Sequence, residues 1–138
     1  MKKAFTLVEI ILVVVIIALL SGLVLTKIAG KGKQARIAAA QAQIANLKSA
    51  LNNFEIDCGR FPTTAEGLDA LITRPSSLGD NVQWRAYLDD NKLPQDPWGK
   101  PYIYLCPGTI NTDGFDIYSA GPDGQQGTQD DIGNASSN

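Results

Sequence analysis

MKKAFTLVEIILVVVIIALLSGLVLTKI, residues 1–28, is the stretch that decides the fold of this chain. Residues 10–25 are Ile, Leu, Val and Ala, apart from one Ser-Gly pair. A helix over residues 5–25 would be roughly 30 Å long, which matches the hydrocarbon core of a bilayer. Glu9 is the exception, because a carboxylate in lipid costs about 2.5–3.5 kcal/mol on insertion scales. We therefore expect a membrane helix in which Glu9 either lies near the interface or meets a positive partner.

A basic start followed by an apolar run is also typical of simpler targeting segments. A secretory signal peptide fits poorly, because its apolar part is shorter and ends in a small-residue cleavage site, whereas this run continues into LTKIAGKGKQAR, residues 25–36. A plain signal anchor explains the length of the run but not the sequence FTLVE, residues 5–9. Charge does not fix the orientation, because lysines stand on both sides of the run.

The composition excludes several classes of function. The 138 residues have room for one domain with a modest core. Residues 1–50 carry seven Lys/Arg and one acid, whereas residues 51–138 carry five Lys/Arg and thirteen Asp/Glu. An acidic C-terminal part argues against nucleic-acid binding, which requires a basic face. The absence of His removes the commonest general base and transition-metal ligand.

Residues 27–57 are expected to continue the apolar helix into water. The segment is rich in Ala, Gln, Lys and Leu, which favour helices, and it contains no Pro. Its apolar residues recur at spacings of three, four and seven, at Ile37, Ile44, Leu47, Leu51 and Phe54. We interpret this stripe as a face packed against the globular part of the same chain, in preference to a coiled coil.

The region 58–101 is predicted to combine a short helix with an ordered loop. Gly59 ends the long helix, and Thr63 or Thr64 caps a short helix over residues 65–73. The loop that follows has no sustained periodicity and is expected to order around its aromatic and leucine side chains.

Residues 102–119 are predicted to form a small antiparallel sheet against the helix. Alternating residues indicate strands over 102–106 and 115–119, separated by a turn. Asp113 and Asp116 are expected to be surface or turn residues.

The C-terminal region, residues 120–138, contains GPDGQQGTQDDIGN, in which Asp123, Asp130 and Asp131 stand among glycines. Carboxylates this close in sequence repel one another, so they need water, distance or a cation. Calcium takes oxygen ligands from carboxylates and backbone carbonyls, and glycines let a loop turn several carbonyls inward. The spacing is not that of an EF-hand. On spacing alone, a calcium loop and a solvated acidic loop both remain open.

Cys58 and Cys106 are too few and too far apart in sequence for a zinc site. Two separate thiols and a disulfide both remain open, since a domain outside the cytoplasm permits a disulfide.

The sequence KKAFTLVEIILVVVIIALLSGLV, residues 2–24, resembles the N-terminus of type IV pilins and type II secretion pseudopilins. The resemblance implies that a prepilin peptidase removes a leader, residues 1–4, by cleaving between Ala4 and Phe5, and that the new N-terminus is methylated. Ala4 stands where the family usually has Gly. Glu9 then becomes the fifth residue of the mature chain, and the new amine can pair with Glu9 of a neighbouring subunit.

Three later motifs resemble the major pseudopilins of type II secretion systems more specifically: RFPTTAEGLDAL, LPQDPWGKPY and FDIYSAGPDGQQGTQDDI, in that order along the chain. The resemblance covers nearly the whole length. It implies an α+β, type IV pilin-like fold with one long N-terminal helix, a membrane half over residues 5–26 and an amphipathic half packed on a small domain. That domain, residues 27–138, is expected to be periplasmic and to contain a short antiparallel sheet and a C-terminal metal-binding loop.

The same resemblance implies one bound calcium ion. Its ligands would be the side chains of Asp123, Asp130 and Asp131, with the backbone oxygens of Ala120 and Thr128.

The implied function is structural. Copies of the chain would polymerise through the N-terminal helix into a pseudopilus that drives export of folded proteins across the outer membrane. The implied partners are further copies, minor pseudopilins, the inner-membrane assembly platform and the prepilin peptidase.

Two other functions fit the sequence less well. A type IV pilin or competence pseudopilin is disfavoured by the acidic terminal loop and by the absence of a C-terminal Cys pair. A membrane-anchored enzyme is disfavoured because the chain has no His, no Cys nucleophile dyad and no phosphate-binding Gly loop.

Overall fold

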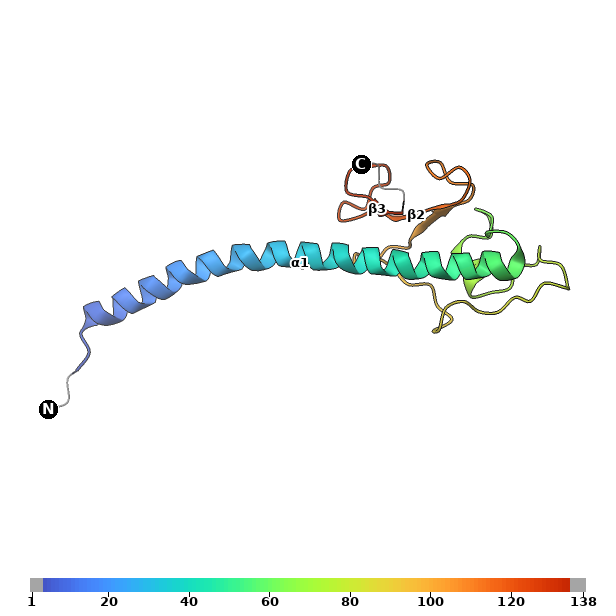
Figure 1. Cartoon of the computed structure of the whole chain (residues 1–138). Helices are drawn as coiled ribbons and strands as arrows, with labels where there is room; N and C mark the ends of the chain where they lie inside the picture. The colour runs from blue at the N-terminus through green and yellow to red at the C-terminus, as the bar shows by residue number, and fades with distance from the viewer. Residues whose placement is uncertain (1–3, 135–138) are drawn as a thin grey trace. The chain divides into compact units, whose positions relative to one another are not determined.

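The computed structural model describes residues 4–134, without the side chains of residues 22–30. The elements follow one another in the order α1, η1, β1, β2 and β3 (Figure 1). The chain divides into two compact units, Met1–Ala35 and Arg36–Asn138. Most of the predicted leader, residues 1–3, and the last four residues of the predicted calcium region lie outside the described residues.

Helix α1 spans Leu7–Cys58 and confirms that the apolar segment continues into the amphipathic one. It begins after Thr6, whose hydroxyl oxygen accepts a hydrogen bond from the backbone N–H of Glu9 at 3.3 Å. It ends where Gly59 adopts a φ of 75° and donates its N–H to the carbonyl of Glu55 at 2.7 Å. The predicted helix terminator is therefore confirmed.

The core of the second unit forms on the apolar stripe of α1. Ile44, Leu47, Leu51 and Phe54 are at most 4% exposed. They belong to one cluster with side chains from the rest of this unit, which include Leu68, Leu71, Tyr102, Tyr104, Phe115 and Ile117. The stripe from Ile44 to Phe54 thus packs on the chain's own domain, as predicted, whereas Ile37 is only half-buried and lies outside the cluster.

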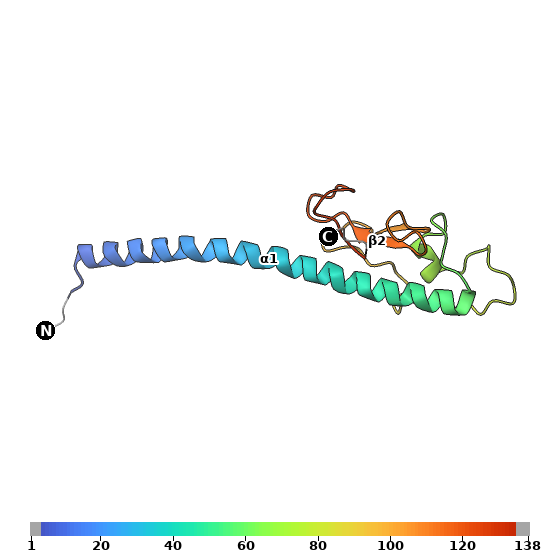
Figure 2. The same ribbon diagram turned by 45° about the horizontal axis from the view of Figure 1, so that its top comes forward.

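Within the described residues, the sheet has three antiparallel strands in the order β1-β2-β3: β1 is Ile103–Leu105, β2 is Asp116–Ser119 and β3 is Ile132–Gly133. Figure 1 labels β2 and β3, and Figure 2 shows β2 in a turned view. The first two strands confirm the prediction within one residue at their ends. The third was not predicted, and it lies inside the region expected to be a calcium loop. A Cβ at Gly133 would lie 2.6 Å from the Cβ of Tyr118, so glycine allows this close pairing.

The predicted helix over residues 65–73 is wrong in its extent. The structure has a turn followed by a four-residue 3₁₀ helix, η1, at Leu68–Leu71. Gly67 has φ 60° and ψ −162°, which an α-helix cannot include. Thr63 nevertheless caps the turn: its hydroxyl accepts the N–H of Glu66 at 3.3 Å, and its own N–H donates to the Glu66 carboxylate at 2.7 Å.

Candidate assembly segment and C-terminal loop

The N-terminal part of the chain presents apolar side chains on every side of the helix. Ala4 and Phe5 precede α1, and Glu9 lies exposed in its first turn. The large apolar side chains from Phe5 to Leu20 are 47–76% exposed. A helix that is apolar all round is stable when lipid or other helices cover it. Within the part of the chain that the structure describes, no helical stretch is both long and apolar enough to cross a membrane.

The C-terminal loop is folded on itself by hydrogen bonds from its own backbone. A carboxylate oxygen of Asp123 accepts the N–H of Gln125 at 2.9 Å, and Oδ2 of Asp131 accepts the N–H of Gly127 at 2.7 Å. The N–H of Asp131 donates to the carbonyl of Thr128 at 3.3 Å. These bonds leave the loop compact, with its acidic side chains near its two ends.

The loop closes where its first residues meet its last. Ala120 is buried, and a Cβ at Gly121 would lie 2.0 Å from the carbonyl oxygen of Asp130. Gly121 also has a φ of 63°, so both the contact and the backbone conformation require glycine there.

The predicted calcium ligands offer suitable atoms without forming a finished cluster. Across the residues described, no three Asp, Glu, His or Cys side chains are grouped as a metal site. Oδ1 of Asp131, however, is buried and has no hydrogen-bond partner among the described residues. A buried carboxylate oxygen without a partner is costly, and an oxygen-seeking cation would satisfy it. The donor chemistry of the loop therefore fits calcium.

Asp96, in the sequence LPQDPWG, connects a neighbouring turn to this loop. It is 4% exposed, and its Oδ1 accepts the N–H groups of Trp98 at 3.0 Å and Lys100 at 2.8 Å. Its Oδ2 accepts the hydroxyl of Ser119, whose oxygen in turn accepts the N–H of Gly121 at 3.1 Å. Asp96 was not predicted as a site residue, although an Asp before Pro is a recognisable turn signal.

Asp116 does not lie where it was expected. It was predicted to be a surface or turn residue, but it lies on β2 and is 2% exposed. Its carboxylate accepts five hydrogen bonds from the segment before it: from the N–H and hydroxyl of Thr109, the N–H of Ile110, and the N–H and side-chain amide of Asn111. Burial opposes ionisation, but these hydrogen bonds outweigh it and lower the pKa of Asp116.

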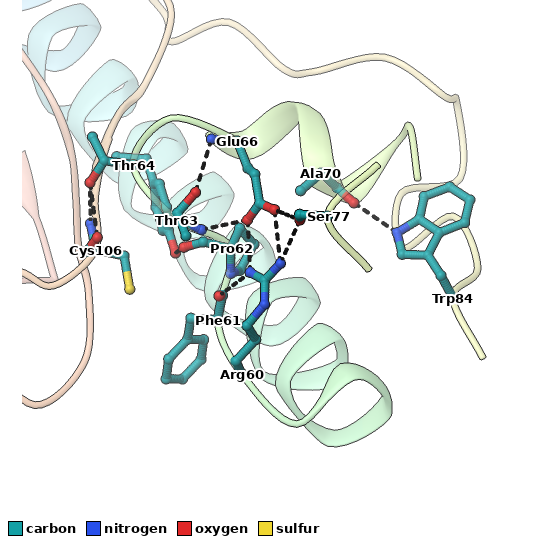
Figure 3. Close-up of polar contacts among 11 residues, drawn as sticks. Arg60, Phe61, Pro62, Thr63, Thr64, Glu66, Ala70, Ser77, Trp84 and Cys106 are labelled. Atoms are coloured by element: carbon teal, nitrogen blue, oxygen red, sulfur yellow. Dashed lines mark hydrogen bonds and ion pairs between the residues drawn. The ribbon is translucent and has the colours of Figure 1, made fainter. Parts of the chain in front are cut away.

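Figure 3 shows a second polar cluster at the turn after α1. The guanidinium of Arg60 donates to both carboxylate oxygens of Glu66, at 2.7 and 2.8 Å, and Ser77 also donates to Glu66. The hydrogen bond from Arg60 is the main cause that holds the pKa of Glu66 far below its usual range. The hydroxyl of Thr64 accepts the N–H of Cys106 at 2.9 Å, which ties this turn to the end of β1.

The two cysteines are free thiols in the structure, not the disulfide that the sequence left open. The sulfur of Cys58 lies 3.7 Å from the hydroxyl oxygen of Tyr87. Cys106 is held through its backbone N–H and carbonyl, both of which bond the hydroxyl of Thr64.

Comparison with known proteins accounts for this combination of features. The family described as "Type II secretion system (T2SS), protein G" matches residues 27–135. The chain is 41% identical to the type II secretion system core protein G of Aeromonas hydrophila, over 96% of this chain and 92% of that protein. It is 41% identical to the protein of the same name from Pseudomonas aeruginosa, over 96% of this chain and 94% of that protein.

A solved structure is also similar to this chain. The crystal structure of the major pseudopilin from the type 2 secretion system of enterohaemorrhagic Escherichia coli is 38% identical, with a TM-score of 0.66, and the match covers 76% of this chain and 87% of that one. The chain therefore belongs to the protein G family of the type II secretion system, the major pseudopilins, and is a structural subunit rather than an enzyme.

Proposed function

We propose that copies of this chain polymerise through their N-terminal helices into a pseudopilus, and that this filament drives export of folded proteins across the outer membrane. The apolar segment from Phe5 to Leu20 is the observation that carries the proposal, because its side chains are exposed all round the helix. Such a surface is stable either in lipid or against other apolar helices. A subunit that is held in a membrane before it joins a filament is surrounded first by lipid and then by other apolar helices.

The location follows from the same segment. Residues 5–26 cross the inner membrane once, with the N-terminus in the cytoplasm and residues 27–138 in the periplasm. The sequence supports this because Glu9 is the only charged residue among residues 5–26, a span that continues into residues 22–26, whose side chains the structure does not describe. The partners in this proposal are further copies of the chain, minor pseudopilins, the inner-membrane assembly platform and the prepilin peptidase.

Processing prepares the subunit for assembly. Prepilin peptidase cleaves between Ala4 and Phe5 and the new N-terminus is methylated, so that a positive amine becomes available to Glu9 of a neighbouring copy. Phe5 is exposed, and the described residues 4–6 precede α1 without regular structure, which is compatible with access by a peptidase.

Mass spectrometry of the membrane form tests the processing step. We expect a chain that begins with methylated Phe5 in cells that contain the peptidase, and a chain that retains its leader in a strain without the enzyme. A leader retained equally in both strains would show that the proposed cleavage does not occur.

We also propose that one calcium ion stabilises the C-terminal loop. The ligands in this proposal are the side chains of Asp123, Asp130 and Asp131 with the backbone oxygens of Ala120 and Thr128. The buried, unpartnered Oδ1 of Asp131 supports it. A ligand that binds only the folded chain raises its stability by mass action.

Thermal unfolding of the full-length chain in detergent tests the calcium proposal. Calcium is expected to raise the unfolding midpoint and a chelator to lower it, and Asp131→Asn is expected to remove most of the difference. Asp113→Asn is the matched control, because Asp113 is an exposed acid outside the loop. A wild-type midpoint that is the same in calcium and in chelator would refute the proposal.

A further inference from the structure

We infer that Lys100 is a positioning residue for the C-terminal loop: its ammonium group holds the backbone at Gly124, so the loop keeps its shape before a cation binds. The contact itself is independent of calcium. Only its consequence for cation binding rests on the function proposed above.

The contact between Lys100 and Gly124 is close and specific. Nζ of Lys100 donates to the carbonyl oxygen of Gly124 at 2.9 Å. The lysine stem lies over the α-carbon of Gly124, because a Cβ there would meet Nζ at 2.1 Å and Cε at 2.8 Å. A larger residue at position 124 would therefore displace the lysine.

The backbone of Lys100 is fixed by hydrogen bonds within its turn. Its N–H donates to Oδ1 of the buried Asp96, and its carbonyl accepts the N–H of Asp96, both at 2.8 Å. The flanking residues Gln95 and Pro101 form an antiparallel bridge. The lysine side chain therefore starts from a backbone position that the turn fixes.

The same turn holds the loop at a second point. Asp96 reaches the N–H of Gly121 through the hydroxyl of Ser119. The loop is thus held at Gly121 by Asp96 and at Gly124 by Lys100. Asp123, a proposed calcium ligand, lies between these two points, so they define where its backbone can be.

The charge of Lys100 acts on a carbonyl rather than on a ligand carboxylate. Within the described residues, the ion pairs are Arg60–Glu66 and Arg85–Asp57, and Lys100 forms none. The ammonium of Lys100 therefore forms no ion pair with Asp123, whose Oδ1 accepts the N–H of Gln125 and whose Oδ2 accepts no hydrogen bond from Lys100. Because this lysine is exposed, solvent and salt screen its repulsion of a bound ion. We therefore expect the backbone ordering that Lys100 provides to exceed its repulsion of a bound ion.

Hydrogen exchange of the full-length chain in detergent, with chelator present, tests the contact. Lys100→Met keeps most of the apolar stem but removes the donor. It is expected to speed exchange of the loop amides of Gly124, Gln125 and Gly127 by about threefold to fivefold, the range for an exposed charged contact. Lys100→Arg is expected to restore most of the protection. Lys92→Met is the matched control, because Lys92 is exposed and has no hydrogen bond or ion pair within the described residues.

Calcium titration calorimetry on the same proteins separates this inference from the calcium proposal. Lys100→Met is expected to bind calcium about fivefold more weakly than wild type, and Lys92→Met as tightly as wild type. Wild-type protein that binds no calcium would remove the calcium proposal alone, and the exchange result would still decide the role of Lys100. Exchange in Lys100→Met at the wild-type rate, or equal acceleration in Lys92→Met, would overturn the inference.

Discussion

Two buried carboxylates, Asp96 and Asp116, organise the backbone of two turns that precede β2, residues 96–100 and 109–111. Each accepts several N–H groups from a turn close to it in sequence, and Asp96 adds the hydroxyl of Ser119. Buried charges are tolerated when hydrogen bonds replace the lost water. These two side chains therefore fix turns that have no regular secondary structure of their own.

Asp116→Asn is expected to lower the free energy of unfolding by about 2–3 kcal/mol, because an amide NH₂ would face backbone donors that need an acceptor. Tryptophan fluorescence during denaturant unfolding measures the change, since Trp84 and Trp98 both lie in the second unit. Asp113→Asn in the adjacent exposed turn is the control and is expected to change stability by less than about 0.5 kcal/mol. Equal losses in the two variants would show that the hydrogen bonds of Asp116 contribute nothing specific.

The Arg60–Glu66 pair is expected to make stability fall in acid. The pKa of Glu66 is lowered in the folded chain from its usual value of 4.5, so the unfolded chain binds the proton more readily. The contribution of Glu66 is therefore complete above about pH 4.5 and is lost progressively as the pH falls further. Glu66→Gln has no such proton to bind, so its stability should fall less between pH 5 and pH 3. Unfolding midpoints that decline in parallel for the two proteins would contradict this role.

Helix α1 changes its surface along its length. From Leu7 to Leu20 the side chains are apolar on all sides except at Glu9, whereas residues 44–54 bury one stripe in the core of the second unit. One element therefore supplies both a surface for a membrane or filament and the central support of a globular domain.

Leu51→Ala is expected to destabilise the second unit by about 2–5 kcal/mol, because it leaves a cavity at a fully buried position. Ile56→Ala on the same helix is the control: Ile56 is 78% exposed, and its loss should cost less than about 0.5 kcal/mol. Denaturant unfolding followed by tryptophan fluorescence measures both. A similar cost at the two positions would mean that the stripe is not the core.

The elements that could be predicted from the sequence are those with a long or repeated pattern. Helix α1 and the first two strands follow from periodicity, and the end of α1 follows from Gly59. The helix expected over residues 65–73 is shorter because Gly67 takes a conformation that a capping pattern does not reveal. Strand β3 has two residues, too few for any alternation, and it forms only because β2 is already placed beside it.

The residues of the candidate site also include some that the sequence could indicate and some that it could not. Phe5, Glu9 and the acidic triplet of the terminal loop could be proposed as site residues from local sequence and family resemblance. Lys100 and Asp96 could not, because they act on residues more than twenty positions away and only the folded domain brings them together. Asp116 was misjudged because an acid next to a turn is usually exposed.

At the scale of the whole molecule, the chain joins an apolar helical segment to a domain stabilised by its own core and polar turns. Membership of the major pseudopilin family explains why both parts occur in one short chain. In the function proposed above, the apolar segment is the surface for polymerisation.

Electron microscopy of filaments tests polymerisation most directly. The host is a bacterium with a type II secretion system from which its own protein G gene has been deleted, and an antibody against the second unit labels the filaments. We expect the wild-type chain to form labelled filaments and to restore export. We expect Glu9→Gln to be processed normally but to remain in the membrane without assembling. A wild-type chain that is processed at Phe5 in this host, yet forms no filaments and restores no export, would contradict the proposed function.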